Sequence, residues 1–299
     1  MIRAKKTQAE IAETIGFSQS TVSKELRRNR GKRGYREKQA QSKATERKKN
    51  KQRRGLVIVG RLEERVDDRL KLKHSPEQIS GALKKQGIEV SQETIYQYVV
   101  KDRRNGGGLY KHLRINGKRR YRRRAKAGRV GKIPDRVGIE HRPKAVEKRC
   151  RYGDWEVDLI EGAKGSGFLL SLYERKSRLG KLVHLEAKGA AETADAIVET
   201  LSGYRVRTLT YDNGLEFSSH TRVSEALSAN GCFCQPYHSW EKGGVENFNG
   251  LVRQYFPKGS HFGEISSSNL QRVEDEINER PRKLLRYRSP SELEQKLAA

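Results

Sequence analysis

The sequence predicts an α/β domain with a mixed sheet, preceded by an all-α and strongly basic N-terminal half. The charge is uneven: residues 1–134 carry 39 Lys/Arg against 13 Asp/Glu, whereas residues 135–299 carry 25 against 24. Helical patterns fill the first half, and strand-like runs alternate with helical patterns only from about Cys150 onwards. The length of 299 residues is enough for about two domains with real cores.

The basic half indicates a polyanionic partner, and nucleic acid fits best. A merely solvated basic surface is the alternative. A membrane surface fits less well, because no basic amphipathic helix with a bulky aromatic face occurs, and we expect no membrane partner. No run of about 18 apolar residues occurs, so we expect no membrane span, and the N-terminus lacks the apolar core of a signal peptide. The cysteines Cys150, Cys232 and Cys234 have no framework spacing, which favours a reducing compartment. We expect Cys232 and Cys234 in the core and not on a metal.

Residues 7–30 have the pattern of a helix-turn-helix. A capping box opens at Thr7, Gly16 ends the first helix, and Val22 and Leu26 turn a second helix towards the first. The outward side of that second helix is polar and basic, and its candidate DNA contacts are Gln19, Thr21, Ser23, Lys24, Arg27 and Arg28. Such side chains suit base edges and phosphates in a major groove. A plain helical hairpin is the alternative.

The next segments extend the helical half. Residues 32–54 are dense in Lys and Arg, which indicates either a solvated helix or an arm lying along phosphates. Residues 56–72 read as a helix with Val59 on its apolar side. Residues 75–101 repeat the first theme, with a capping box at Ser75, and we interpret them as a second helix-turn-helix. A helical spacer is the alternative.

Residues 103–134 hold 13 Lys/Arg and no acid. We expect a basic linker that is disordered until DNA binds, with Arg122, Arg123 and Arg124 on phosphates; a purely solvated run is the alternative. The predicted boundaries are 1–55 for the first helix-turn-helix and basic arm, 56–102 for the second helical region, 103–148 for the linker, 149–282 for the α/β core and 283–299 for a C-terminal tail.

In the core, the order is three strands, a helix, a strand, a helix, a strand and further helices. Strands are predicted at 155–160, 168–173, 181–185, 208–212 and 232–235, and helices at 190–201, 221–229, around Glu246 and at 269–278. This order is typical of a mixed α/β sheet of the ribonuclease-H type and differs from that of a regular doubly wound sheet.

Three carboxylates occupy positions from which they can meet. Asp158 lies on the polar face of a strand, and Asp212 ends another strand before Asn213-Gly214, where we expect a tight turn with positive φ. Glu246 lies on the outer face of a helix. Two such charges about 4 Å apart repel by about 4 kcal/mol at an effective dielectric near 20, so convergence implies a neutralising cation.

Oxygen ligands suit magnesium, with manganese as a substitute. Two such ions would activate a water or a 3′-hydroxyl for phosphodiester displacement. Each acid also has an ordinary alternative, as a turn residue or a solvated side chain. The acids Asp154, Glu161, Glu216 and Glu241 compete for the same role.

Longer segments around these acids resemble the insertion-sequence 30 family of bacterial DDE transposases. The matching segments are Trp155–Asp158, Tyr211–Phe217, Pro236–Lys258, Asn278–Arg282 with Ser289-Pro290, and Ser20–Arg30. The resemblance covers nearly the whole chain, and the segment Pro236–Lys258 is its most specific part.

The resemblance implies an RNase-H-like integrase core in which Asp158, Asp212 and Glu246 are catalytic metal ligands, with 33 residues between the last two. It also implies cleavage at terminal inverted repeats, strand transfer into target DNA and a phosphate contact for Arg253. Since two double-stranded ends must be held together, we expect a homo-oligomer on DNA, in the bacterial cytoplasm at the nucleoid. A phage-type integrase or nuclease, or a non-catalytic helix-turn-helix regulator, are the rival interpretations.

Overall fold

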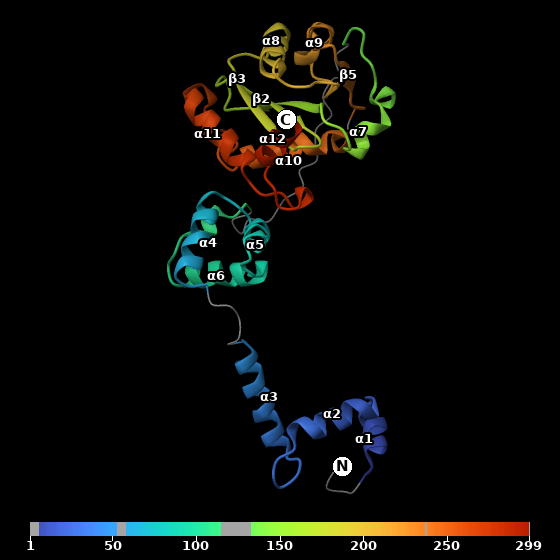
Figure 1. Cartoon of the computed structure of the whole chain (residues 1–299), viewed down its shortest axis with the longest axis vertical. Helices are drawn as coiled ribbons and strands as arrows, with labels where there is room; N and C mark the ends of the chain where they lie inside the picture. Colours follow the sequence, from blue (N-terminus) through green and yellow to red (C-terminus); the bar gives the residue numbers. More distant parts are fainter. Residues whose placement is uncertain (1–5, 53–57, 115–132, 237, 299) are drawn as a thin grey trace. The chain divides into compact units, whose positions relative to one another are not determined.

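The computed structural model of the chain describes residues 6–52, 58–114, 133–236 and 238–298. It divides into two compact units, Met1–Ile58 and Val59–Ala299 (Figure 1). The predicted DNA contacts Arg122, Arg123 and Arg124 lie outside the described residues.

The first unit consists of three helices, α1 (Gln8–Ile15), α2 (Gln19–Asn29) and α3 (Glu37–Gln52). The capping box is confirmed, because the Thr7 hydroxyl accepts the Glu10 N–H while the Glu10 carboxylate accepts the Thr7 N–H. Gly16 ends α1 with φ of 70°. Val22 is buried between the two helices. The basic segment after α2 forms a helix, the first of its two predicted alternatives.

A second helical bundle opens the larger unit, with α4 (Arg61–Lys71), α5 (Pro76–Lys85) and α6 (Gln92–Arg104). The capping box at Ser75 is confirmed. The predicted helix at 56–72 is wrong at its start: Gly60 has φ of 57°, so α4 begins at Arg61, and Val59, expected on the apolar side, is 60% exposed.

Further helices lie inside the ranges predicted as linker and tail. They are η2 (Leu109–His112), η3 (Ile139–His141), α7 (Lys144–Lys148), η7 (Lys283–Leu285) and α12 (Pro290–Ala298). Leu109 and Val146 are buried, so the described parts of the predicted linker pack on the unit. The predicted domain boundaries stay predictions.

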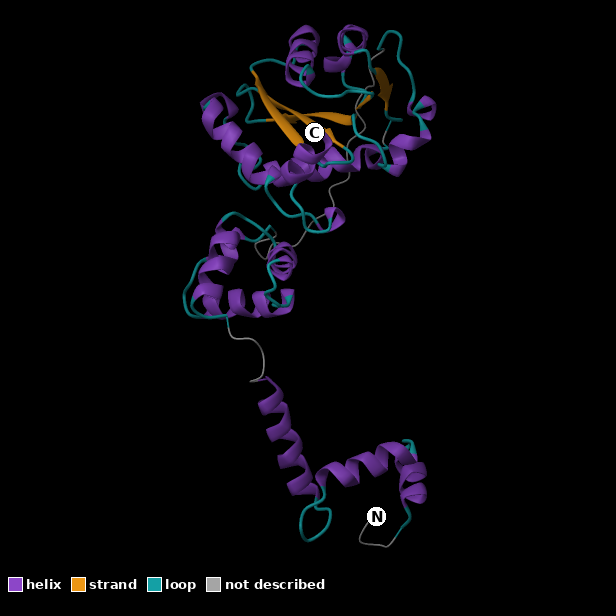
Figure 2. Ribbon diagram, viewed as in Figure 1, coloured by secondary structure: helices purple, strands orange, loops and turns teal. Residues whose placement is uncertain are grey.

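The sheet, whose strands are orange in Figure 2, has five strands in the order β3-β2-β1-β4-β5. They are β1 (Asp154–Glu161), β2 (Phe168–Glu174), β3 (Gly180–Leu185), β4 (Thr208–Tyr211) and β5 (Asn230–Phe233). The first three strands are antiparallel, and β4 and β5 run parallel to β1. This is the predicted RNase-H-like mixed sheet. The last strand occupies 230–233, not 232–235, because it pairs residue by residue with β4, which ends where Tyr211 meets Phe233.

Helices cover both faces of the sheet (Figure 1). On one face, α8 (Ala190–Leu201) and α9 (His220–Leu227) pack over Trp155 and Val157 of β1. On the other, α10 (Gly243–Val252) and α11 (Ser267–Asn278) pack over Ile160 and Leu169. Side chains alternate along a strand, so Asp154, Glu156 and Asp158 lie on the face of β1 that α10 covers.

The three cysteines are free, and Cys232 and Cys234 are buried as predicted, while Cys150 is exposed. Within the described ranges, no helix combines the length and the apolar character that a membrane crossing needs.

Candidate active site

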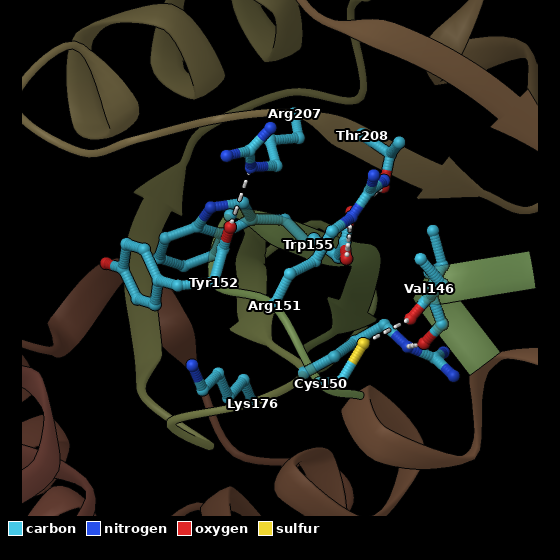
Figure 3. Close-up of polar contacts among 12 residues, drawn as sticks. Val146, Cys150, Arg151, Tyr152, Trp155, Lys176, Arg207 and Thr208 are labelled. Carbon is cyan, nitrogen blue, oxygen red and sulfur yellow. Dashed lines mark hydrogen bonds and ion pairs between the residues drawn. The ribbon is translucent and has the colours of Figure 1, made fainter. Parts of the chain in front are cut away.

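One face of β1 carries three carboxylates at alternate positions, Asp154, Glu156 and Asp158. The first is fully buried and fully paired. Its carboxylate accepts hydrogen bonds from Arg151 Nε at 2.9 Å and from the Thr208 hydroxyl at 2.7 Å. Figure 3 shows Arg151 and Thr208 at this end of the strand. Asp154, a competitor for the metal-ligand role, is therefore a structural acid that joins β1 to β4.

The second carboxylate, Glu156, fastens α10 to the sheet. It forms a buried ion pair with Arg175, and its Oε2 accepts the Val245 N–H at 2.7 Å in the first turn of α10. A Cβ on Gly244 would lie 2.5 Å from the Tyr173 ring and 2.7 Å from Glu156 Oε2. The glycine therefore lets the helix start directly against the sheet.

The third carboxylate, Asp158, shares a lysine with Asp212. Lys242 Nζ lies 3.0 Å from Asp158 Oδ1 and 3.2 Å from Asp212 Oδ2. The other oxygen of each aspartate is held by a neutral donor: Asn249 Nδ2 donates to Asp158 Oδ2 at 2.7 Å, and the Gly214 N–H donates to Asp212 Oδ1 at 3.0 Å. Each aspartate thus turns one oxygen towards the same cation.

The turn after the second aspartate differs from the prediction. Gly214 has φ of −74°, and Asn213 is not in the positive-φ region either. The Asn213 side chain instead donates to the Cys234 carbonyl at 2.8 Å and accepts from Arg136 at 2.9 Å. A Cβ at Gly214 would lie 2.4 Å from the Glu216 carboxyl carbon, so a larger residue there would require the end of the Glu216 side chain to move.

All three predicted acids line one cavity of about 320 Å³. Its lining consists of Asp158, Asp212, Asn213, Gly214, Cys234, Gln235, Pro236, His238, Lys242 and Glu246. Among the residues that the structure describes, no three His, Cys, Asp or Glu side chains are grouped closely enough to hold a metal ion. The two aspartates converge on Lys242, and Glu246 contributes to the wall of the same cavity.

Lys242 is a site residue that the sequence-based reasoning missed. It is only 5% exposed. Burial alone would lower its pKa, but the charges of Asp158 and Asp212 raise that pKa above its ordinary value, so the ammonium stays charged. Burial also raises the pKa of Asp158, against the opposing effect of Lys242. The available signal was the position of Lys242 one helical turn before Glu246, which is weak because such lysines are usually solvated.

The remaining competing acids do not line the cavity. Glu161 is exposed at the end of β1. Glu216 is buried beside Lys188 at 3.1 Å. Glu241 accepts the Gln235 N–H at 2.8 Å.

The predicted DNA contacts on α2 are all exposed: Gln19, Thr21, Ser23, Lys24, Arg27 and Arg28. Arg253 is placed differently from the acids. It is the C-cap residue that follows α10, donates to the Glu161 carbonyl at 2.7 Å and lies over the Phe262 ring, outside the cavity lining. Burial lowers its pKa.

Comparison with known proteins gave relatives over nearly the full length, although no family model matches. The chain is 40% identical over 297 residues to the transposase for insertion sequence element IS4351 of Bacteroides fragilis, covering 98% of this chain and 91% of that one. It is 32% identical over 308 residues to transposase InsI for insertion sequence element IS30A of Escherichia coli strain K12, covering 98% and 79%. Among solved structures, the catalytic core domain of BIV integrase is similar with a TM-score of 0.38 and 20% identity, covering 48% of this chain and 95% of that one.

The mixed five-stranded sheet, with aspartates brought together from β1 and β4, is the RNase-H-like core that the sequence predicted. The identities over nearly the whole chain then fix the family. The chain belongs to the insertion-sequence 30 family of transposases.

Proposed function

We propose that this transposase binds the terminal inverted repeats of its insertion sequence, cleaves a strand at each end in a metal-dependent reaction and transfers that strand into target DNA. The observation that carries the proposal is the convergence of Asp158 and Asp212 on one cation, Lys242 Nζ, at 3.0 and 3.2 Å. Such convergence of like charges is unfavourable unless a cation neutralises them.

The donor chemistry of the cavity fits a hard divalent cation. Asp158, Asp212 and Glu246 supply only carboxylate oxygens, which suit magnesium or manganese. We propose that these three residues hold the metal, in a site for two ions. Bound there, the metal would supply activation of a water or 3′-hydroxyl and stabilisation of the leaving oxygen.

The residues around the acids prepare them for this task. Asn249 and the Gly214 N–H each hold one oxygen of an aspartate, which leaves the other oxygen directed at the cavity. Lys242 neutralises the pair before a metal binds. Glu156 anchors the first turn of α10 and so fixes the position of Glu246 at the cavity wall.

Double-stranded DNA would be held by the basic parts of the chain. We propose that the exposed face of α2 reads the inverted repeats. Arg253 and the arginines Arg122, Arg123 and Arg124 would contact phosphates, with the steep salt dependence that such contacts cause. Joining two ends requires two DNA sites held together, so the active species would be a homo-oligomer at the nucleoid, in the bacterial cytoplasm.

The test is cleavage and joining of a labelled inverted-repeat end with magnesium, comparing the wild-type protein with Glu246→Gln. This change keeps the side-chain shape and removes the charge. Glu161→Gln is the matched control, because Glu161 is an exposed acid of the same sheet that lies outside the cavity. We expect Glu246→Gln to bind DNA normally and to be inert, and Glu161→Gln to cut and join like wild type.

Other outcomes would replace the proposal. If Glu246→Gln cuts as well as wild type, Glu246 is not a metal ligand. If the wild-type protein binds the ends but neither cuts nor responds to magnesium, the chain is a DNA-binding regulator. Cleavage without preference for one pair of ends would favour the integrase or nuclease reading.

A further inference from the structure

An exposed tryptophan stands beside the candidate active site. Trp240 lies in η5 (Ser239–Lys242), and its residue is 69% exposed. The chain has two tryptophans, and the other, Trp155, is fully buried in the core of the sheet. Two residues after Trp240, Lys242 binds Asp158 and Asp212.

The ring of Trp240 is held from one side only. It stacks on the His238 ring, with centroids 4.3 Å apart and planes inclined by 27°. His238 lines the cavity of the acids, and its Nδ1 lies 3.3 Å from Glu241 Oε1. Glu241 in turn accepts the Gln235 N–H at 2.8 Å. One face of the indole is therefore supported by a chain of contacts that ends on the backbone, and the high exposure leaves the other face to the solvent.

We propose that Trp240, supported by His238, is a stacking platform for one unpaired nucleobase of the DNA strand next to the phosphate being cleaved. This inference rests on the proposed function and specifies how the same site takes its substrate. A flat, rigid ring with one free face beside a phosphodiester-cleaving cavity matches the way proteins hold unpaired bases. Since every base has such a face, the platform would require no particular sequence.

The occupant has to be an unpaired base. Bases inside a duplex are covered on both faces by their neighbours, and a protein ring reaches a base face only when the nucleotide has left the stack or lies at an open end. The opposite orientations of two side chains in η5 agree with an unpaired base as the occupant. Lys242 turns inward to the aspartates, whereas Trp240 turns outward, so one short helix would contact both the reacting region and the base that flanks it.

The first experiment measures binding without chemistry, in EDTA. The probes are a duplex with a single unpaired adenine at one 3′ end and the same duplex with an abasic nucleotide in that position. Tryptophan fluorescence is recorded for the wild-type protein and for Trp240→Leu, which keeps apolar bulk but has no ring. The difference between the two proteins isolates Trp240, because Trp155 is common to both. Trp240→Phe is the conservative variant.

We expect the adenine probe to quench Trp240 fluorescence and the abasic probe to leave it unchanged. Trp240→Leu should bind the adenine probe about tenfold more weakly, the order of magnitude of one lost base–aromatic stack, and should bind the abasic probe like wild type. Trp240→Phe should recover most of that affinity.

Equal quenching by both probes, or equal affinity of wild type and Trp240→Leu for the adenine probe, would overturn the proposal. If Trp240→Leu changes self-association in sedimentation experiments without DNA and leaves the probe difference intact, the ring contacts a second copy of the chain and the proposal is also wrong. These readouts need no metal. A failure of the platform is therefore distinguishable from a failure of the proposed reaction, which Glu246→Gln tests with magnesium.

Discussion

The same face of β1 buries carboxylates in two different ways. Asp154 and Glu156 are fully buried, and each has fixed partners, an arginine together with a hydroxyl or a backbone N–H. Asp158, two residues further on, has a side chain that is 21% exposed and shares its cation, Lys242, with Asp212. The comparison teaches that the partners around a carboxylate, and not its position in an alternating pattern, separate an acid that holds the fold from one that is available for chemistry.

The two kinds of acid should differ in how much the free energy of unfolding depends on them. Removing one partner of a buried ion pair typically costs about 3–5 kcal/mol, because the other charge stays buried without compensation. Around Asp158, loss of the carboxylate leaves Lys242 still paired with Asp212. Substitution of Glu156 should therefore mainly lower the free energy of unfolding, whereas substitution of Asp158 should mainly lower strand joining.

The largest expected effect is on catalysis by Asp158→Asn. If Asp158 is a metal ligand as proposed, strand joining with magnesium should fall by on the order of a thousandfold, because the change removes a negative charge from the proposed metal site. The free energy of unfolding should change by about 1 kcal/mol or less. Joining assays and denaturant unfolding on the same preparation check both. A stability loss as large as that of a buried ion pair would remove the distinction between Asp158 and Glu156.

The next effect is on stability, by Glu156→Gln. Arg175 would remain buried without its carboxylate, so the free energy of unfolding should fall by about 3–5 kcal/mol. The double variant Glu156→Gln with Arg175→Met should recover part of this loss, because it removes the uncompensated charge. Denaturant unfolding of the wild type, the two single variants and the double variant measures the coupling energy between the two side chains. Additive losses would mean that the two side chains do not act as a pair.

Much of the fold was predictable because local chemistry and tertiary structure agree. The capping boxes at Thr7 and Ser75 formed as expected, and the alternation of Trp155 and Val157 with polar residues placed the right face of β1 on the core. Asp158, Asp212 and Glu246 line one cavity, and their role as metal ligands stays a prediction.

The remainder depends on partners that are distant in sequence. Glu156 has the same alternating pattern as Asp158, so only the arrival of Arg175 and α10 shows that it is structural. In the sequence, Lys242 has the pattern of an ordinary solvated loop lysine, and only the structure shows its contacts with Asp158 and Asp212. Gly214 has φ of −74°, and its N–H donates to Asp212 Oδ1, a contact that the residue types alone do not determine.

The smallest effect sharpens the comparison at the point where Glu156 holds α10. A Cβ on Gly244 would lie 2.5 Å from the Tyr173 ring and 2.7 Å from Glu156, whereas a Cβ on Gly243 would meet nothing within 4 Å. Gly244→Ala should therefore lower the free energy of unfolding by about 1–3 kcal/mol through overpacking. Gly243→Ala, at the first residue of the same helix, should be neutral or slightly stabilising.

The pair of glycine variants also tests how α10 serves the site. If contact with Glu156 fixes Glu246 at the cavity wall, Gly244→Ala should lower joining activity below that of Gly243→Ala even at temperatures where both proteins are fully folded, as judged by circular dichroism. Equal activity of the two folded variants would mean that the contact between Glu156 and α10 stabilises the fold but does not determine the position of Glu246 at the cavity wall.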